Sequence, residues 1–254
     1  MPALLNGALP ESVHFIGVCG TAMAGVAAEL HARGVRVTGS DRAAYPPMST
    51  YLAARGVAVL EGYDAAHLDP PPGLVVVGNA ISRGNPELEA LLDAQLPFCS
   101  LPELLEGLFL PRKETVVVTG THGKTTTTAL ATWILKEAGL DPSWLIGGVP
   151  AGLEGAFHLG GGAPFVLEGD EYDTAFFDKR PKFLHYRPRI LILNNIEFDH
   201  ADIYPDIGRI REVFRHLLRI LPRSGLVVAN ADDAEVRDLL PLCPCPAQTY
   251  SMEG

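Results

Sequence analysis

A loop of glycine, lysine and threonine residues is the strongest chemical pattern in this chain. Within VVVTGTHGKTT (residues 116–126), Gly120 and Gly123 have no Cβ, so their backbone N–H groups can approach and surround a phosphate. Lys124 offers a mobile positive charge to β- and γ-phosphates, and the Thr125 hydroxyl suits a Mg²⁺ ion. These residue types in this order predict the binding of a nucleoside triphosphate.

The sequence around the loop supplies the strand and the helix that such a loop requires. Residues 115–119 are β-branched and predict a strand, and residues 125–138 predict a helix that ends at Gly139. The general motif G-x-x-x-x-G-K-[ST] would begin at Val118, which is not glycine, so the loop is a variant. A plain glycine turn with an incidental lysine is the alternative, and the flanking strand and helix favour the phosphate loop.

A run of carboxylates follows an apolar strand later in the chain. EGDEYDTAFFDKR (168–180) contains five carboxylates and two cations, a composition typical of a solvated loop. Glu168, however, comes directly after the apolar residues 165–167, at a strand end where an α/β sheet presents its ligands. Mg²⁺ prefers oxygen ligands, so we interpret Glu168 as a metal ligand. Substrate contact and local hydrogen bonding both remain open for Asp170, Glu171 and Asp173.

A second glycine turn lies near the N-terminus. HFIGVCGTAM (14–23) resembles the dinucleotide fingerprint G-x-G-x-x-G imperfectly, because Cys19 and Ala22 replace its second and third glycines. Asp41 follows about 20 residues later, at the end of the next predicted strand, where a carboxylate can accept ribose hydroxyls. The imperfect glycines fit a diphosphate that is not part of NAD, and a plain strand–turn–helix is equally compatible.

Alternating strands and helices predict two parallel-sheet units of the α/β class. In the first unit we expect strands at residues 13–17, 35–38, 57–60 and 74–77, and helices at 22–33, 48–55, 86–94 and 101–110. In the second we expect strands at 115–119, 190–193 and 226–229, and helices at 125–138 and 207–221. PRK (111–113) interrupts the pattern. We therefore place a boundary between a Rossmann-like domain, 1–110, and an incomplete P-loop ATP-binding domain, 111–254.

Composition limits the partners of this chain. Its net charge of −10 argues against a nucleic-acid partner, since phosphate backbones are bound by a surplus of Lys and Arg. No apolar run approaches the ~20 residues of a membrane helix, and the N-terminus lacks the features of a signal peptide. The four cysteines form no C-x-x-C pair and fit reduced thiols. We therefore expect a soluble, cytoplasmic protein that binds phosphates locally; its oligomeric state is not indicated.

Three motifs in order resemble those of the Mur ligases, the ATP-dependent amide-forming enzymes of peptidoglycan synthesis. The loop GTHGKTTTT (120–128) resembles their phosphate loop, and the first glycine turn with GSD (39–41) resembles their UDP-binding domain. NNIEFDH (194–200) resembles the N-I-x-x-D-H segment of the branch that acts on UDP-N-acetylmuramate. The likeness runs from about residue 13 to the end of the chain.

The resemblance implies a ligase that uses ATP and Mg²⁺. ATP would phosphorylate the lactyl carboxylate of UDP-N-acetylmuramate, an amine would attack the acyl phosphate, and phosphate would leave. FFDKR (176–180) and YPPM (45–48) are similar to the peptidoglycan-recycling branch, whose amine is the tripeptide L-Ala-γ-D-Glu-meso-diaminopimelate. The L-alanine-adding branch and a non-catalytic UDP-sugar-binding module are the alternatives. Family members carry a third, amine-binding domain; we expect it beyond Gly254, and expect this chain alone to ligate poorly.

The resemblance also implies roles for residues of the second domain. Lys124, Glu168 and His200 would be catalytic, with Thr125 and Glu168 on one Mg²⁺ and Glu168 and His200 on the other. His200 is an unusual ligand for a hard cation, and a hydrogen-bonded loop histidine is its alternative. His122 can also face the substrate, and Asn195 can serve a structural turn. The expected ATP contacts are Gly120, Thr121, His122, Gly123, Lys124, Thr125, Thr126 and Asn195.

In the first domain the resemblance implies the site for UDP-N-acetylmuramate. Backbone groups of residues 17–23 would hold the diphosphate, and Ser40 and Asp41 would face the uridine. NAIS (79–82) follows a strand end, where α/β sheets bind ligands, and a structural loop there is equally compatible. The expected substrate contacts are Gly17, Cys19, Gly20, Thr21, Met23, Ser40, Asp41, Ala80 and Ser82.

Overall fold

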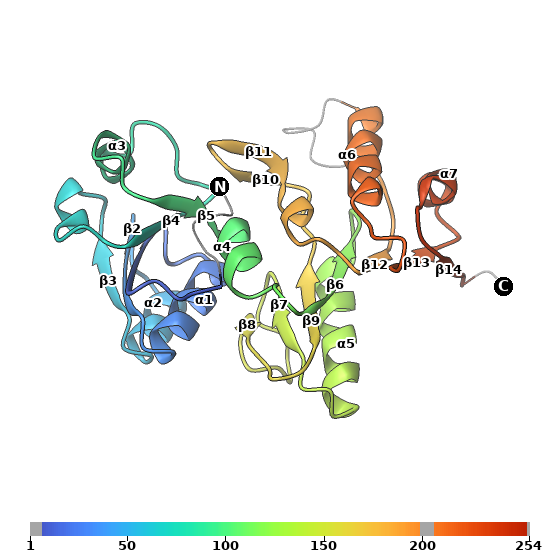
Figure 1. The fold of residues 1–254 in the computed structure, drawn as a ribbon, viewed down its shortest axis with the longest axis horizontal. Coiled ribbons are helices and arrows are strands. Elements are labelled where there is room, and N and C mark those ends of the chain that lie inside the picture. The colour runs from blue at the N-terminus through green and yellow to red at the C-terminus, as the bar shows by residue number, and fades with distance from the viewer. Residues whose placement is uncertain (1–6, 199–205, 253–254) are drawn as a thin grey trace. The chain divides into compact units, whose positions relative to one another are not determined.

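The computed structural model describes residues 7–198 and 206–252, and the chain divides into two compact units (Figure 1). The first comprises Met1–Pro111 with two later segments, Gly155–His158 and Asp173–Lys179. The second comprises Arg112–Glu154, Leu159–Tyr172 and Arg180–Gly254. The main segment of the first unit therefore ends at Pro111, and two short later segments of the chain also belong to that unit.

A five-stranded parallel sheet forms the centre of the first unit, in the order β3-β2-β1-β4-β5. Because the order reverses at β1, the loops leaving β1 and β4 diverge at the carboxyl edge, the usual ligand position in an open α/β sheet. The Rossmann-like sheet predicted from the sequence is confirmed. The strands are β1 (Ser12–Ile16), β2 (Arg36–Asp41), β3 (Ala58–Glu61), β4 (Leu74–Val77) and β5 (Phe98–Ser100).

Three α-helices and a 3₁₀ turn connect these strands, and a fourth helix, α4, follows β5. Helix α3 begins after Asn85, whose side chain accepts hydrogen bonds from the N–H groups of Glu87 and Leu88. Its apolar side packs on Ile16 and Val75 of the sheet. The elements are α1 (Thr21–Ala32), α2 (Met48–Ala53), α3 (Pro86–Asp93), α4 (Leu101–Leu108) and the turn Ala65–Leu68.

Parallel strands also form the sheet of the second unit, in the order β14-β13-β12-β6-β9-β7. β6 lies between β12 and β9, with Thr119 opposite Leu193 and Val118 opposite Glu168. The carboxyl ends of these three strands therefore meet at one edge. The strands are β6 (Glu114–Thr119), β7 (Ser143–Leu145), β9 (Pro164–Glu168), β12 (Ile190–Leu193), β13 (Leu226–Asn230) and β14 (Ala247–Tyr250).

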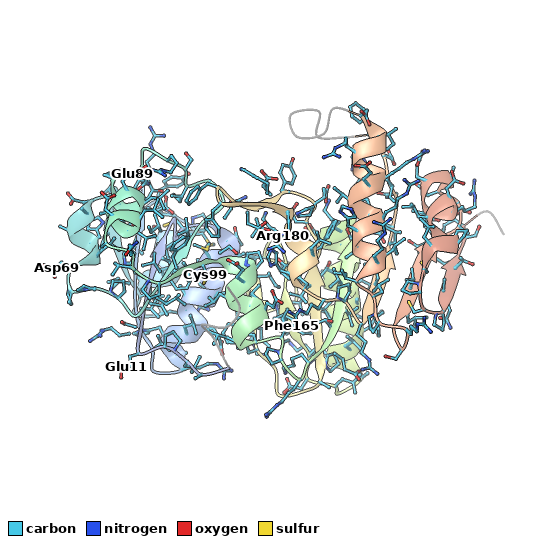
Figure 2. All side chains as sticks on the ribbon, turned by 45° about the horizontal axis from the view of Figure 1, so that its top comes forward. Glu11, Asp69, Glu89, Cys99, Phe165 and Arg180 are labelled. Carbon is cyan, nitrogen blue, oxygen red and sulfur yellow. The ribbon has the colours of Figure 1, made fainter. Side chains whose placement is uncertain are left out.

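Helix α5 (Lys124–Glu137) follows β6 and lies along this sheet (Figure 1). Its side chains Ala131 and Leu135 pack on an apolar cluster of β6 and β9. In Figure 2, Phe165 of β9 is labelled within the second unit, where it is fully buried, while Glu11 and Asp69 point outward from the first unit. The later connections are α6 (Ile207–Arg219), α7 (Ala234–Leu239) and the 3₁₀ turns Lys182–His185 and Leu240–Leu242.

The carboxylate run does not stay within one unit. Its first residues belong to the second unit, whereas Asp173–Lys179 belong to the first, as does β8 (Phe157–His158). Strands β10 (Asp173–Ala175) and β11 (Asp178–Pro181) pair with each other, and Phe176 between them packs on the apolar core of the first unit. The Phe177 ring meets Phe98 edge-on, with 5.1 Å between the centroids. The FFDKR segment, interpreted above only as a feature of one family branch, therefore has a packing role of its own.

A buried polar network links β1 to α3 in the first unit. His14 Nε2 lies 2.5 Å from Glu87 Oε1, and His14 Nδ1 lies 2.8 Å from Thr38 Oγ1. His67 Nδ1 lies 3.4 Å from the second carboxylate oxygen of Glu87. The Glu87 side chain has no exposure to solvent, and that of His14 is 1% exposed. A carboxylate at this depth is tolerated because both of its oxygens have hydrogen-bonding partners.

Replacing Glu87 with alanine should lower the free energy of unfolding by about 3 kcal/mol or more, because the imidazole of His14 stays buried without this partner. Thermal unfolding followed by circular dichroism measures the loss. Asp93→Ala, at the exposed end of the same helix, is the control and should change the value by less than about 0.5 kcal/mol. Equal losses for the two variants would mean that the network adds nothing to stability.

Candidate active site

The loop between β6 and α5 is shaped by two glycines. Gly120 has a φ of +135° and Gly123 a φ of +78°, both in the range that side chains disfavour. A Cβ on Gly120 would lie 2.9 Å from the backbone N and O of Asn195. Gly123 is the N-cap of α5, so the first N–H groups of that helix face the loop. The loop therefore runs close against the segment that follows β12.

Asn194 and Asn195, directly after β12, hold this loop in place. The side-chain oxygen of Asn195 accepts a hydrogen bond from His122 N at 2.7 Å, and the backbone carbonyl of Asn195 accepts one from Thr121 N at 3.0 Å. Asn194 Nδ2 donates to Thr127 Oγ1 at 3.1 Å and to the His122 carbonyl at 3.3 Å. Asn195 thus positions the loop, and its direct contact with ATP stays a prediction.

Among the other predicted ATP contacts, His122 and Thr126 are exposed, whereas Thr121 is buried. The His122 side chain is 56% exposed, with Nε2 3.7 Å from Glu197 Oε2. Thr121 Oγ1 accepts a hydrogen bond from Glu197 N at 2.8 Å. Thr126 is exposed in the first turn of α5. An exposed imidazole is accessible to a substrate as well as to a nucleotide, so both roles considered for His122 stay open.

Glu168 at the end of β9 lies next to Thr125 at the start of α5. Glu168 Oε1 accepts a hydrogen bond from Thr125 Oγ1 at 2.8 Å, and Oε2 accepts one from Gly147 N at 2.7 Å. Two of the three predicted metal ligands are therefore together, and both present the oxygen atoms that Mg²⁺ prefers. The third, His200, lies outside the described residues. Residues 7–198 and 206–252 contain no group of three His, Cys, Asp or Glu side chains that could hold a metal.

The ammonium group of Lys124 is surrounded by oxygen atoms. It donates to the carbonyls of Gly120 at 2.8 Å and Thr121 at 3.1 Å, and to Glu171 Oε1 at 3.0 Å. The Lys124 side chain is 14% exposed and that of Glu171 is 5% exposed. The sequence alone left the role of Glu171 open, because its partner is set by the path of the chain beyond β9.

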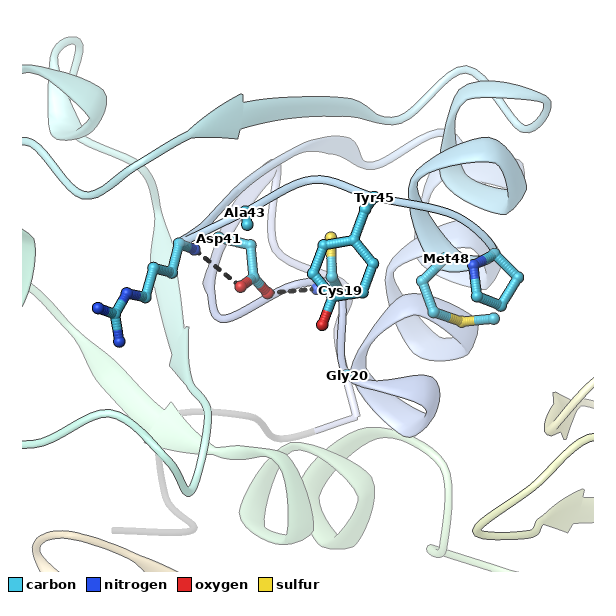
Figure 3. A pocket seen from close by; sticks show the side chains of 8 residues that line it. Cys19, Gly20, Asp41, Ala43, Tyr45 and Met48 are labelled. Atoms are coloured by element: carbon cyan, nitrogen blue, oxygen red, sulfur yellow. Dashed lines mark hydrogen bonds between the residues drawn. The ribbon is translucent and has the colours of Figure 1, made fainter.

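In the first unit, the turn after β1 is tied to the end of β2. Gly17 has a φ of +87°, and its N–H donates to the Ser40 carbonyl at 2.8 Å. Asp41 Oδ2 accepts a hydrogen bond from Cys19 N at 2.8 Å, and Oδ1 accepts one from Arg42 N at 2.8 Å (Figure 3). The carboxylate predicted to face a ribose therefore also shapes the glycine turn.

A pocket of about 300 Å³ lies beside this turn (Figure 3). Three predicted substrate contacts, Cys19, Gly20 and Asp41, are among its lining residues. YPPM also contributes to the pocket, although its sequence indicated only a family branch; Tyr45 is 69% exposed there and presents an aromatic face. The complete lining is Cys19, Gly20, Asp41, Arg42, Ala43, Tyr45, Pro47 and Met48.

The remaining predicted substrate contacts lie near the turn or after β4. Thr21 begins α1, and Met23 is buried on the same helix. Ser40 is fully buried, and its backbone carbonyl accepts hydrogen bonds from the turn after β1. A contact between the Ser40 side chain and uridine stays a prediction. Ala80 and Ser82 are exposed after β4 and are not among the residues that line the pocket.

The charge state of Cys19 suits an anionic ligand. Burial, followed by the charge of the nearby Asp41, raises the pKa of the Cys19 thiol to about 11. The thiol is therefore neutral at pH 7 and does not repel a diphosphate.

Comparison with known families decides the class of this chain. Residues 12–112 match the family described as Mur ligase family, catalytic domain, and residues 118–254 match the Mur ligase middle domain. The chain belongs to the Mur ligase family. The resemblance drawn from the phosphate loop, the first glycine turn and NNIEFDH is confirmed.

Curated Mur ligases of two kinds are similar to this chain. The UDP-N-acetylmuramate–L-alanyl-γ-D-glutamyl-meso-2,6-diaminoheptandioate ligase of Escherichia coli K12 is 49% identical, over 90% of this chain and 50% of its own length. The UDP-N-acetylmuramate–L-alanine ligase of Methylococcus capsulatus is 39% identical, over 94% of this chain and 48% of its own length. The chain spans about half the length of the curated relatives it matches.

Solved Mur ligase structures share the fold of both units. The UDP-N-acetylmuramate:L-alanyl-γ-D-glutamyl-meso-diaminopimelate ligase from Neisseria meningitides gives a TM-score of 0.89 at 44% identity, covering 95% of this chain and 78% of that one. The UDP-N-acetylmuramate–alanine ligase from Thermotoga maritima gives 0.78 at 29% identity, covering 96% and 53%. No helix in the described part of the chain has the length and apolar character needed to cross a bilayer.

The contact between Gly120 and Asn195 can be tested with two alanine variants. Gly139 also has a positive φ, +74°, but an added Cβ there would meet nothing within 4 Å. We expect Gly139→Ala to lower the free energy of unfolding by about 1 kcal/mol, and Gly120→Ala to lower it by about 2 kcal/mol more, because its φ of +135° is also disfavoured and its Cβ in addition collides with Asn195. Urea unfolding measures both values, and similar losses would argue against a close loop contact.

Proposed function

We propose that the complete protein is an ATP-dependent ligase that joins UDP-N-acetylmuramate to the tripeptide L-alanyl-γ-D-glutamyl-meso-diaminopimelate. Two relatives named for this tripeptide are 49% and 47% identical to the chain, whereas six named for L-alanine are 36% to 41% identical. The solved structure named for the tripeptide also has the higher TM-score, 0.89, against 0.78 for the structure named for alanine. A role in peptidoglycan recycling, in the cytoplasm, belongs to this proposal.

The grouping of Lys124, Thr125 and Glu168 around the glycine loop carries the ligase proposal. The N-terminus of α5 offers N–H groups to an anion, and Lys124 adds a full positive charge. Phosphoryl transfer depends mainly on positioning and on neutralising the charge of the transferred group. In a chain with a net charge of −10, that neutralisation has to be local, and this loop concentrates the groups that supply it.

The oxygen donors at this site fit Mg²⁺. Thr125 Oγ1 and Glu168 Oε1, 2.8 Å apart, would hold the ion, which would supply charge neutralisation during phosphoryl transfer. Lys124 and the loop N–H groups would bind the terminal phosphates, and the γ-phosphate would be transferred to the lactyl carboxylate of UDP-N-acetylmuramate. The amine of the tripeptide would then attack the acyl phosphate, and inorganic phosphate would leave.

The first unit is the proposed site for UDP-N-acetylmuramate. The first turn of α1, whose N-cap Gly20 makes no side-chain cap bond, would offer backbone N–H groups beside a neutral Cys19 thiol, and Asp41 lines the adjoining pocket. Tyr45 can provide an aromatic face for the uracil ring. We propose residues 1–110 as the UDP-sugar domain and 111–254 as the ATP domain, with recognition of the amine in the part of the relatives' length that this chain does not span.

The amine assignment is tested with the full-length protein, ATP, Mg²⁺ and UDP-N-acetylmuramate. Phosphate release should be much faster with the tripeptide than with L-alanine. A preference for L-alanine would instead assign the protein to the alanine-adding branch. Absence of turnover with either amine, while UDP-N-acetylmuramate still binds, would favour a non-catalytic module.

The role of Glu168 is tested by nucleotide binding. Glu168→Ala should raise the Kd of ATP in the presence of Mg²⁺ by about tenfold or more, because the metal site loses its carboxylate. Binding of UDP-N-acetylmuramate should stay unchanged. Isothermal titration calorimetry measures both affinities. Glu114→Ala is the matched control: this carboxylate lies in the same unit, at the start of β6, and is 53% exposed. Wild-type ATP affinity in Glu168→Ala would remove this residue from the metal site.

A further inference from the structure

The Lys124–Glu171 ion pair lies inside the proposed nucleotide site. A lysine ammonium has three N–H donors, and this one donates to three acceptors. Two of them are neutral carbonyls of the loop itself, at Gly120 and Thr121. The third belongs to the Glu171 carboxylate, both of whose oxygens lie 3.0 Å from Lys124 Nζ. In this structure, the positive charge of Lys124 that would bind a phosphate is paired with the carboxylate of Glu171.

Glu171 is held in this position by the chain on either side of it. Gly169 N donates to the Val118 carbonyl at 2.7 Å, and a Cβ on Gly169 would lie 2.7 Å from a side-chain atom of Val117. Asp170 accepts a hydrogen bond from Lys182 Nζ at 2.6 Å. The segment after β9 is therefore fastened to β6 and to Lys182, and the Glu171 side chain is 5% exposed. Such a carboxylate cannot swing into solvent without moving its segment.

A bound triphosphate would compete for the same ammonium donors. Its terminal phosphates must replace at least one of these three acceptors, since the ammonium has no fourth N–H donor. The two carbonyls are neutral and belong to the loop that surrounds the phosphates. The carboxylate, in contrast, carries a negative charge in a poorly hydrated position, where it repels an approaching anion more strongly than it would in water.

We propose that Glu171 is a positioning residue that holds Lys124 across the nucleotide-free loop and is exchanged for a phosphate oxygen when ATP binds. The proposal rests on the nucleotide site proposed above. Glu171 then competes with the γ-phosphate for Lys124. It keeps the lysine side chain ordered before ATP binds, and it lowers the affinity for ATP. ATP should be affected more than ADP, because Lys124 reaches the β- and γ-phosphates.

The test is the affinity of the purified protein for ATP and for ADP, each with Mg²⁺, by isothermal titration calorimetry. Glu171→Gln keeps the shape and removes the charge, so it should lower the Kd of ATP by about threefold or more, and that of ADP by less. A merely structural role predicts the opposite, since a damaged loop binds nucleotide more weakly. An unchanged or higher Kd of ATP in Glu171→Gln would overturn the proposal.

Two further variants isolate the charge of Glu171. Glu171→Asp retains the charge and should stay close to the wild-type Kd; a gain as large as that of Glu171→Gln would also overturn the proposal. Asp170→Asn removes the adjacent charge, whose partner is Lys182 rather than Lys124, and should leave the Kd of ATP unchanged. If the wild-type protein binds neither nucleotide, the ATP site and the role of Glu171 fail together. If it binds ATP normally and only the variants disagree, the role of Glu171 alone fails.

Discussion

The register of β6 between β9 and β12 is the constraint on which the second unit depends. Because the strands are parallel, their carboxyl ends meet at one edge, and each strand contributes one part of the site there. β6 leads into the glycine loop, β9 ends at Glu168, and β12 leads into Asn194 and Asn195. A shift of one residue in either pairing would turn Glu168 or the asparagines to the other face of the sheet. The hydrophobic burial of these strands therefore also fixes the positions of the polar groups.

Local contacts would also allow an acidic chain to bind the acidic ligands proposed for it. With a net charge of −10, the protein has no general attraction for nucleotides or UDP-sugars. Each unit instead begins a helix, α1 or α5, directly after a glycine N-cap that makes no side-chain cap bond, so N–H groups of the first helical turn are left for a ligand. Carboxylates near these turns accept hydrogen bonds or face a cation. Asp41 accepts from two backbone N–H groups, and Glu171 faces Lys124. The Cys19 thiol, whose pKa is raised above its ordinary value by burial and by Asp41, adds no negative charge.

The sequence predicted the features that are formed by residues close together along the chain. The phosphate loop, its strand and its helix are contiguous, so residue spacing sufficed to find Gly120, Gly123, Lys124 and Thr125. The parallel sheets follow from alternating apolar runs. Glu168 was accessible to the same reasoning because it directly follows an apolar strand. Their ligand roles remain predictions, whereas their placement at one sheet edge is a feature of the structure.

Features that depend on partners far along the chain were not predictable in this way. Glu171 meets Lys124 across 47 positions, and Glu87 meets His14 across 73. Strands β5 and β7 have three residues each, too few to show a period. Phe176 and Phe177 stand within a run of charges, yet they return the chain to the core of the first unit. In each case the choice of partner is made by tertiary packing, about which local pattern carries no information.

The two carboxylates that flank the phosphate loop illustrate how partner chemistry separates roles that residue type does not. Glu168 and Glu171 stand three positions apart on one segment. Among the described residues, the hydrogen bonds to Glu168 come from neutral donors, Thr125 Oγ1 and Gly147 N, so a cation would gain from its negative charge. Glu171 already faces a cation, so an arriving metal gains less from it, while an arriving phosphate has to compete with it. In the proposed function, metal attraction and phosphate competition would thus be divided between neighbouring residues of the same type by what each one contacts.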